Sequence, residues 1–273
     1  MTETAQDRKP QRDVRRAKKI VILSDTHAGS EFAPYPERLL PADASLHLGT
    51  RYMNECFEHA KEEIGKCDLV ILNGDLIDGR QKKSGGLGLY TPHLRGQVEA
   101  AIELLAPITA KAKRVMRVLG TPYHDDEHDP LGLLDSELGI DSDDVDDVFD
   151  LELRGSGILN VTHHPSFKFE HKGGGMSKTA FYNLVNAARR KAPRARWIVE
   201  SHLHFYAQFE DADVRVTACP CWQLPTPWAR KINRRRFVSD IGCIVMEHDP
   251  TQASEWVTRP ILYDTPKSRV RVA

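Results

Sequence analysis

Five short segments of this chain carry aspartate and histidine, residue types that bind divalent metal ions. In chain order they are Asp25-Thr26-His27, Gly74-Asp75-Leu76-Ile77-Asp78, His124-Asp125, His163-His164 and Ser201-His202-Leu203-His204. Each segment ends a predicted β-strand, and α/β proteins place their active sites at strand ends. Together the segments predict a two-metal hydrolytic site.

The donor types narrow the chemistry of that site. Oxygen and imidazole donors without thiolates suit Mn²⁺, Fe or Zn²⁺, whereas carboxylates alone would indicate Mg²⁺ or Ca²⁺. Asp75 follows Gly74, so the backbone can approach an ion closely and the carboxylate can bridge two cations. Two divalent ions would polarise a phosphate and lower the pKa of water enough to supply hydroxide near neutral pH.

The elements that must position these side chains alternate along the chain, which predicts an α/β protein. The predicted strands are Lys19–Ser24, Lys66–Asn73, Arg114–Leu119, Asp147–Leu153, Ile158–Thr162, Arg196–Glu200, Tyr206–Glu210, Val214–Ala218, Ile241–Glu247 and Glu255–Leu262. The predicted helices are Tyr52–Ile64, Gln97–Lys111 and Met176–Lys191, the last with Ser177 as a candidate cap. A glycine-rich loop from Asp78 to Leu94 is long enough to be functional.

Composition sets the domain organisation. A chain of 273 residues with 40% hydrophobic content can bury one large α/β core. No linker divides it, so we expect a single domain over residues 19–265. Residues 1–18 are polar and charged, which predicts a disordered tail rather than a signal peptide or membrane anchor. No heptad pattern sets an oligomeric state.

The charge balance and the cysteines limit location and partners. The 38 basic and 39 acidic side chains give a net charge of −1, so no field of the whole molecule attracts nucleic acid or membrane. Five scattered cysteines lie mostly inside apolar runs, which favours buried, reduced thiols in a cytoplasmic protein.

The order of the five segments resembles the signature of the calcineurin-like metallophosphoesterases. That signature runs Asp-x-His, Gly-Asp-x-x-Asp, Gly-Asn-His-Asp/Glu, a histidine ending a strand, and Gly-His-x-His, and the match spans about residues 20–247. The resemblance implies a four-layer α/β/β/α sandwich of two mixed sheets. It also implies two divalent ions (Mn, Fe, Zn or Ni), one held by Asp25, His27, Asp75 and His204 and the other by Asp75, His163 and His202.

The third motif departs from the family pattern, because Gly120-Thr121-Pro122-Tyr123-His124-Asp125 has two extra residues and no asparagine. The Thr121 hydroxyl, or a water held by Tyr123, could substitute for the missing amide ligand. The resemblance implies that His124 protonates or stabilises the departing oxygen and that Asp125 orients its ring. His164 follows a predicted ligand and could contact substrate or only pack.

One dense basic cluster lies beyond the tail, formed by Arg230, Lys231, Arg234, Arg235 and Arg236, with Trp222 and Trp228 just upstream. Basic and aromatic side chains together could bind a nucleic-acid backbone and stack its bases. The alternative is a solvated basic surface.

The sequence therefore predicts a cytoplasmic enzyme that hydrolyses phosphomonoesters or phosphodiesters with metal-bound hydroxide, nucleotides and nucleic acids among its candidate substrates. The alternative from another class is a non-catalytic scaffold that retains the fold, motivated by the altered third motif.

Overall fold

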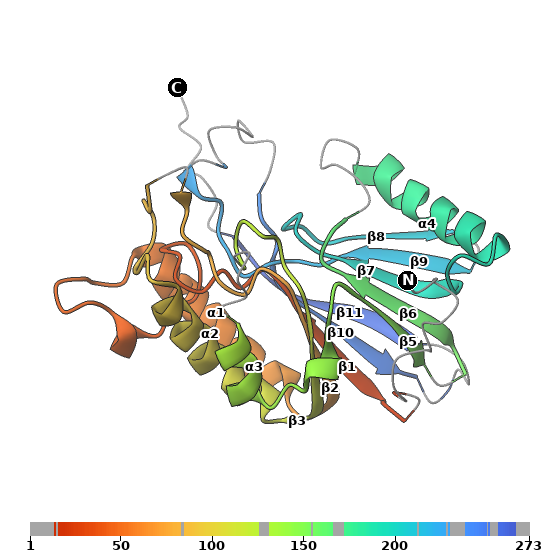
Figure 1. Ribbon diagram of the computed structural model, residues 1–273, viewed down its shortest axis with the longest axis horizontal. Coiled ribbons are helices and arrows are strands. Elements are labelled where there is room, and N and C mark those ends of the chain that lie inside the picture. The colour runs from red at the N-terminus through yellow and green to blue at the C-terminus, as the bar shows by residue number, and fades with distance from the viewer. Residues whose placement is uncertain are drawn as a thin grey trace, which may run out of the picture.

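The computed structural model describes residues 14, 16–82, 85–125, 131–153, 155–165, 172–211, 213–227, 229, 238–249, 251 and 256–265. Two β-sheets pack against each other, with α1, α2 and α3 outside one sheet and α4 outside the other (Figure 1). This arrangement confirms the predicted four-layer α/β/β/α sandwich of two mixed sheets.

The first sheet has six strands in the order β11-β10-β1-β2-β3-β4. Their bounds are β1 Lys19–Leu23, β2 Cys67–Asn73, β3 Ala112–Val118, β4 Val145–Asp146, β10 Ile241–His248 and β11 Trp256–Tyr263. Strands β1 to β4 are parallel, whereas β10 and β11 join through antiparallel pairs. The carboxyl ends of β1, β2 and β3 therefore lie at one edge.

The second sheet has five strands in the order β5-β6-β7-β9-β8. Their bounds are β5 Val148–Leu153, β6 Gly157–Thr162, β7 Ala195–Glu200, β8 Ala207–Asp211 and β9 Val214–Ala218. Strands β6, β7 and β9 are parallel, and β5 pairs with β6 as the predicted hairpin. The ends of β6 and β7 thus also share an edge.

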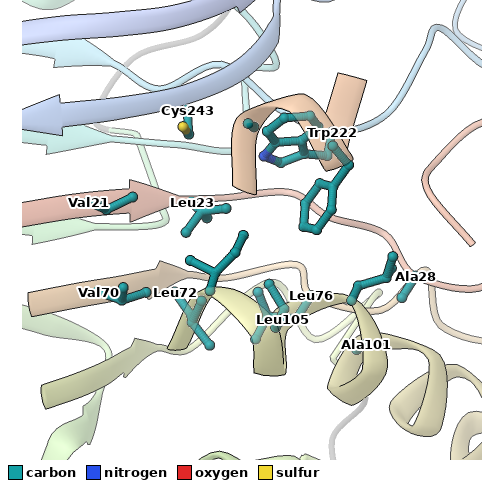
Figure 2. Packing of buried hydrophobic residues seen from close by; sticks show 14 of the residues in the cluster. Val21, Leu23, Ala28, Val70, Leu72, Leu76, Ala101, Leu105, Trp222 and Cys243 are labelled. Atoms are coloured by element: carbon teal, nitrogen blue, oxygen red, sulfur yellow. The ribbon is translucent and has the colours of Figure 1, made fainter. Parts of the chain in front are cut away.

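Alternation along the strands explains why the first sheet is buried on both faces. Ile20 and Ile22 of β1 face the second sheet, where they pack with Phe149 and Trp197. Val21 and Leu23 face the helices instead, together with Leu105. Figure 2 shows this helix-side cluster, in which Leu23 and Leu72 lie beneath Trp222. A third cluster joins α4 to the outer face of the second sheet.

The helices are α1 Leu48–Ile64, α2 Leu94–Thr109, α3 Gly132–Leu138 and α4 Lys172–Ala188, with 3₁₀ turns at Glu37–Leu39 and Ser142–Asp144. Helix α1 begins a turn earlier than predicted, because His47 Nδ1 accepts from the Gly49 N–H and caps it. Helix α4 begins before three glycines, so the predicted cap Ser177 lies inside it and donates to the Gly174 carbonyl. The sequence analysis missed α3 and β4.

Several expectations lie wholly or partly outside the described residues. These are the basic cluster at 230–236, Trp228 and most of the tail at 1–18. Within that tail, Val14 is buried and packs between the sheets. All five cysteines are buried and free, as expected for the thiols. No helix among the described residues has the length and apolar character needed to cross a membrane.

Candidate metal centre

The predicted segments follow the carboxyl ends of β1, β2 and β3 in one sheet and of β6 and β7 in the other. These two groups of strand ends meet. Asp25, after β1, has its Oδ1 atom 3.1 Å from His204 Nε2, after β7. Asp75, after β2, has its Oδ2 atom 3.0 Å from His163 Nε2, after β6. The site therefore lies where the two sheets come together.

Five of the predicted metal-binding residues have a left-handed backbone. Their φ angles are 53° at Asp25, 45° at His27, 49° at Asp75, 70° at His202 and 56° at His204. This conformation is strained for residues other than glycine and concentrates at functional sites. Neighbouring backbone groups hold it, because Asp25 N–H donates to Gly74 O at 3.0 Å and His27 N–H to Asp75 O at 3.1 Å. These turns direct successive polar side chains into one place.

Among the described residues, three groups of donor atoms are close enough to share a metal ion, and two of them consist of predicted ligands. One consists of Asp25, Asp75, His163 and His202, and the other of Asp25, His27 and His204, with the atoms of each group within 4.8 Å of one another. The buried atoms Asp25 Oδ1 and His163 Nε2 face other predicted ligands, His204 at 3.1 Å and Asp75 at 3.0 Å. Buried carboxylates and imidazoles converging in this way fit divalent cations.

Asp25 and Asp75 lie at the centre of the donor groups. The resemblance implies Asp75 as the ligand common to both ions, a role that stays a prediction, and Asp25 belongs to both groups of neighbouring donor atoms. The N–H and Oγ1 of Thr121 donate to Asp75 Oδ1 at 2.6 and 2.9 Å. Asp75 Oδ2 is the oxygen that faces His163 and His202. Thr121 therefore holds Asp75 through its other carboxylate oxygen.

The electrostatics of the site favour a bound cation. Burial opposes ionisation of Asp25, yet the charges of His204 and His163 hold its pKa below the usual range. Burial likewise opposes protonation of His163, but Asp75 and Asp25 raise its pKa to about 9. The buried carboxylates thus draw protons onto the imidazoles. A divalent cation would satisfy the same negative charge.

Backbone and carboxylate acceptors orient the rings. His163 Nδ1 donates to the Asn73 carbonyl at 2.7 Å, which leaves Nε2 facing Asp75. His27 Nδ1 lies 3.0 Å from Asp78 Oδ1, and its Nε2 faces His204. Outer partners of this kind fix the tautomer of a metal-binding histidine.

His124 and Asp125 have separate partners. His124 Nδ1 donates to the Asp78 carbonyl at 3.0 Å, and its ring packs edge-on against His27. Asp125 Oδ2 instead accepts from the Gly120 N–H at 2.7 Å. Asp125 was expected to orient the ring of His124. Its hydrogen bond goes to the Gly120 backbone instead, and the His124 ring contacts Asp78. Burial and Asp75 raise the pKa of Asp125 to about 7, and burial and His27 lower that of His124.

The two remaining candidates lie at the exposed rim. Tyr123 is exposed, and its hydroxyl donates to Gln81 Oε1 at 3.2 Å. His164 is exposed beside His163, with ring centroids 5.6 Å apart. Both are placed where a substrate could reach them.

The sequence analysis missed two buried amides that support the site. Asn73 donates to Thr162 O and to Ser201 Oγ, and so links β2 to the segments that carry His163 and His202. Gln223 Nε2 donates to Asp78 Oδ1 at 2.9 Å. Neither amide is part of a sequence motif with a recognisable spacing, because the partners of both are far away in the sequence.

A family model described as calcineurin-like phosphoesterase matches residues 18–252. The chain belongs to this family. Members are metal-dependent with two ions, which agrees with the paired donor groups of this chain. No curated protein matches the chain.

Solved structures similar to this chain share little sequence with it. A mutant of Vps29 from Entamoeba histolytica is 8% identical with a TM-score of 0.43, over 90% of this chain and 99% of that one. An archaeal phosphodiesterase is 14% identical with a TM-score of 0.41, over 89% and 99%. A predicted phosphoesterase from Streptococcus pneumoniae is 14% identical with a TM-score of 0.38, over 89% and 98%. The family assignment rests on the family model.

Proposed function

We propose that this phosphoesterase hydrolyses phosphate monoesters or diesters with two divalent cations bound at the junction of its sheets. The observation that carries the proposal is the convergence of two donor groups, built around buried carboxylates, from the ends of β1, β2, β6 and β7. Asp25, His27 and His204 would hold one cation, and Asp75, His163 and His202 the other, with Asp25 close to both. When bound, the cations would polarise the phosphate and supply a nucleophilic hydroxide near neutral pH.

The chain's own residues would bind and orient the ester. His202, with 42% of its side chain exposed, marks the open side of the site. Tyr123 and His164 would contact the ester from the rim. Asp25 and Asp75 are fully buried, whereas His202 and His204 are partly exposed, so the described residues open the centre to water on the imidazole side.

His124 would protonate the leaving oxygen. Its Nδ1–H is committed to the Asp78 carbonyl, so the transferred proton must come from Nε2. Burial and the neighbouring His27 lower the pKa of His124, which makes its protonated form a stronger acid. Asp78, by fixing this ring, takes the orienting role that the sequence analysis gave to Asp125.

The metal, the location and the substrate class complete the proposal. The mixed oxygen and imidazole donors favour Mn, Fe, Zn or Ni over Mg or Ca. Five free cysteines favour the cytoplasm. Nucleotides and nucleic acids are the candidate substrates, and the basic residues in the sequence at 230–236 favour them.

The test is hydrolysis of p-nitrophenyl phosphate and bis-p-nitrophenyl phosphate by metal-free full-length protein, with Mn²⁺, Fe²⁺, Zn²⁺ and Ni²⁺ added separately. We expect two bound cations per chain and turnover that requires them. A folded protein that binds one cation and turns over neither ester would favour the scaffold alternative. Salt-sensitive cleavage of DNA or RNA, lost when Arg234, Arg235 and Arg236 are neutralised, would identify a nuclease.

A further inference from the structure

Asp78 is the common partner of two buried side chains from distant parts of the chain. Its Oδ1 accepts a hydrogen bond from Gln223 Nε2 at 2.9 Å and lies 3.0 Å from His27 Nδ1. The same Gln223 amide donates to Ser30 Oγ at 3.1 Å. All four residues are buried, with Gln223 only 6% exposed. A buried carboxylate is stable only when donors surround it.

His27 presents a nitrogen to each of two donor groups. Its Nε2 lies 3.2 Å from His204 Nε2, in the group shared with Asp25. Its Nδ1 faces Asp78. His27, Asp78 and His124 form a third group, whose donor atoms lie within 4.8 Å of one another. A neutral imidazole has one lone pair and one N–H, so it cannot be a ligand on both sides.

Asp78 decides which side carries the proton. Its ionised carboxylate only accepts hydrogen bonds, and His27 Nδ1 is buried with no other partner among the described residues. The proton therefore belongs on Nδ1 and the lone pair on Nε2. The group of His27, Asp78 and His124 is thus an outer layer of the metal centre and not a third cation site.

Gln223 suits the task of holding Asp78 because it is a neutral donor. An amide provides two N–H groups without compensating the charge that must attract the His27 proton. Gln223 also belongs to a segment that contacts the first motif directly, because the neighbouring Trp222 N–H donates to the Asp25 carbonyl at 3.0 Å. That segment follows β9 and lies outside the five motifs.

We propose that Gln223 is a positioning residue for the metal centre: by holding Asp78 it keeps His27 protonated at Nδ1 and presents His27 Nε2 to the cation. The proposal deepens the function proposed above and rests on it. It predicts that removal of the Gln223 amide weakens cation binding even though Gln223 is no ligand.

The first experiment is calorimetric titration of the metal-free full chain with Mn²⁺. In Gln223→Met, which keeps the side-chain volume, we expect about tenfold or more weaker binding, as is usual when an outer partner of a metal ligand is lost. The matched control is Asn183→Leu, because the Asn183 amide also makes two hydrogen bonds, to Ala195, on the far helix α4. That variant should lose thermal stability and keep the wild-type Mn²⁺ affinity.

The second experiment observes the His27 proton directly, in the wild type and in Gln223→Met. In Zn²⁺-loaded protein with ¹⁵N-labelled histidine, the NMR spectrum should show His27 protonated at Nδ1, and Gln223→Met should broaden or lose this signal. A His27 proton on Nε2 in the wild type would overturn the proposal. Wild-type affinity in Gln223→Met would also overturn it, while leaving the proposed function standing. A wild-type protein that binds no Mn²⁺ would overturn both.

Discussion

The two sheets contribute different chemistry to the centre. The six-stranded sheet supplies the carboxylates, Asp25 and Asp75, which are fully buried. The five-stranded sheet supplies only imidazoles, of which His204 and His202 have 18% and 42% of their side chains exposed. The buried half concentrates negative charge, and the other half balances it and opens to solvent. Neither half is a metal site alone.

Asn73, at the end of β2, joins these halves. Its amide donates to Thr162 O at 3.2 Å and to Ser201 Oγ, both in the second sheet's strand ends. Its carbonyl accepts from Ser24 Oγ at 2.6 Å and from His163 Nδ1 at 2.7 Å. These protein contacts therefore help to set the spacing between the carboxylates and the imidazoles. The following predictions test the division of roles between the sheets.

The largest effect should come from removing a carboxylate of the buried half. Asp75→Asn leaves His163 and His202 without their anionic partner, so we expect loss of ester hydrolysis and Mn²⁺ affinity weaker by more than about a hundredfold. Asp68→Asn is the matched control, because Asp68 lies on the same strand at its opposite end and contacts Lys113. Full activity in a folded Asp75→Asn protein would exclude the proposed mechanism.

His124 follows β3 of the six-stranded sheet, which supplies the carboxylates, but we expect it to act on the substrate. We expect His124→Ala to lower turnover by about a hundredfold, the usual contribution of a general acid, with Mn²⁺ affinity unchanged. Steady-state kinetics and titration calorimetry measure the two effects separately. The surface histidine variant His59→Ala provides the control. Loss of cation binding in His124→Ala would instead make His124 a ligand.

Balance of charge between the halves predicts how cation binding depends on pH. In the metal-free protein the carboxylates raise the pKa of His163 to about 9 despite its burial, so below that pH a cation must displace a proton. Affinity for Mn²⁺ should therefore rise about tenfold per unit as the pH increases toward 9, then level off. Calorimetry in buffers of different ionisation enthalpy would count the released protons. A flat profile between pH 7 and 9 would contradict this assignment.

The smallest effect should come from Thr121, which donates hydrogen bonds to Asp75 Oδ1. Thr121→Val keeps the backbone N–H bond to Asp75 and removes the hydroxyl bond, so affinity for the second cation should fall roughly fivefold, or about 1 kcal/mol. Thr121→Ser keeps the hydroxyl and should bind like the wild type. If Thr121→Val weakened only the cation held by Asp25, His27 and His204, Asp75 would belong to that donor group instead.

Much of this molecule follows from local sequence. Strands such as β1 and β2 are apolar runs followed at once by polar ligands, and the rule that strand ends gather at one edge brings Asp25 near Asp75. The order of the motifs extends that inference to His163, His202 and His204. Short elements escaped it. Helix α3 spans only seven residues, too few for a clear helical period, and β4 only two.

The tertiary structure decided what depends on contacts between distant residues. The left-handed turns at the ligand residues have no compositional signal, because aspartate and histidine adopt them only where surrounding hydrogen bonds offset the strain. The choice of Asp78 over Asp125 as the partner of His124 depends on how two loops pack. Gln223 reaches Asp78 across 145 positions in the chain. Sequence thus identified the ligand types and their strand ends, while long-range packing determined the conformations of the ligands and their supporting partners.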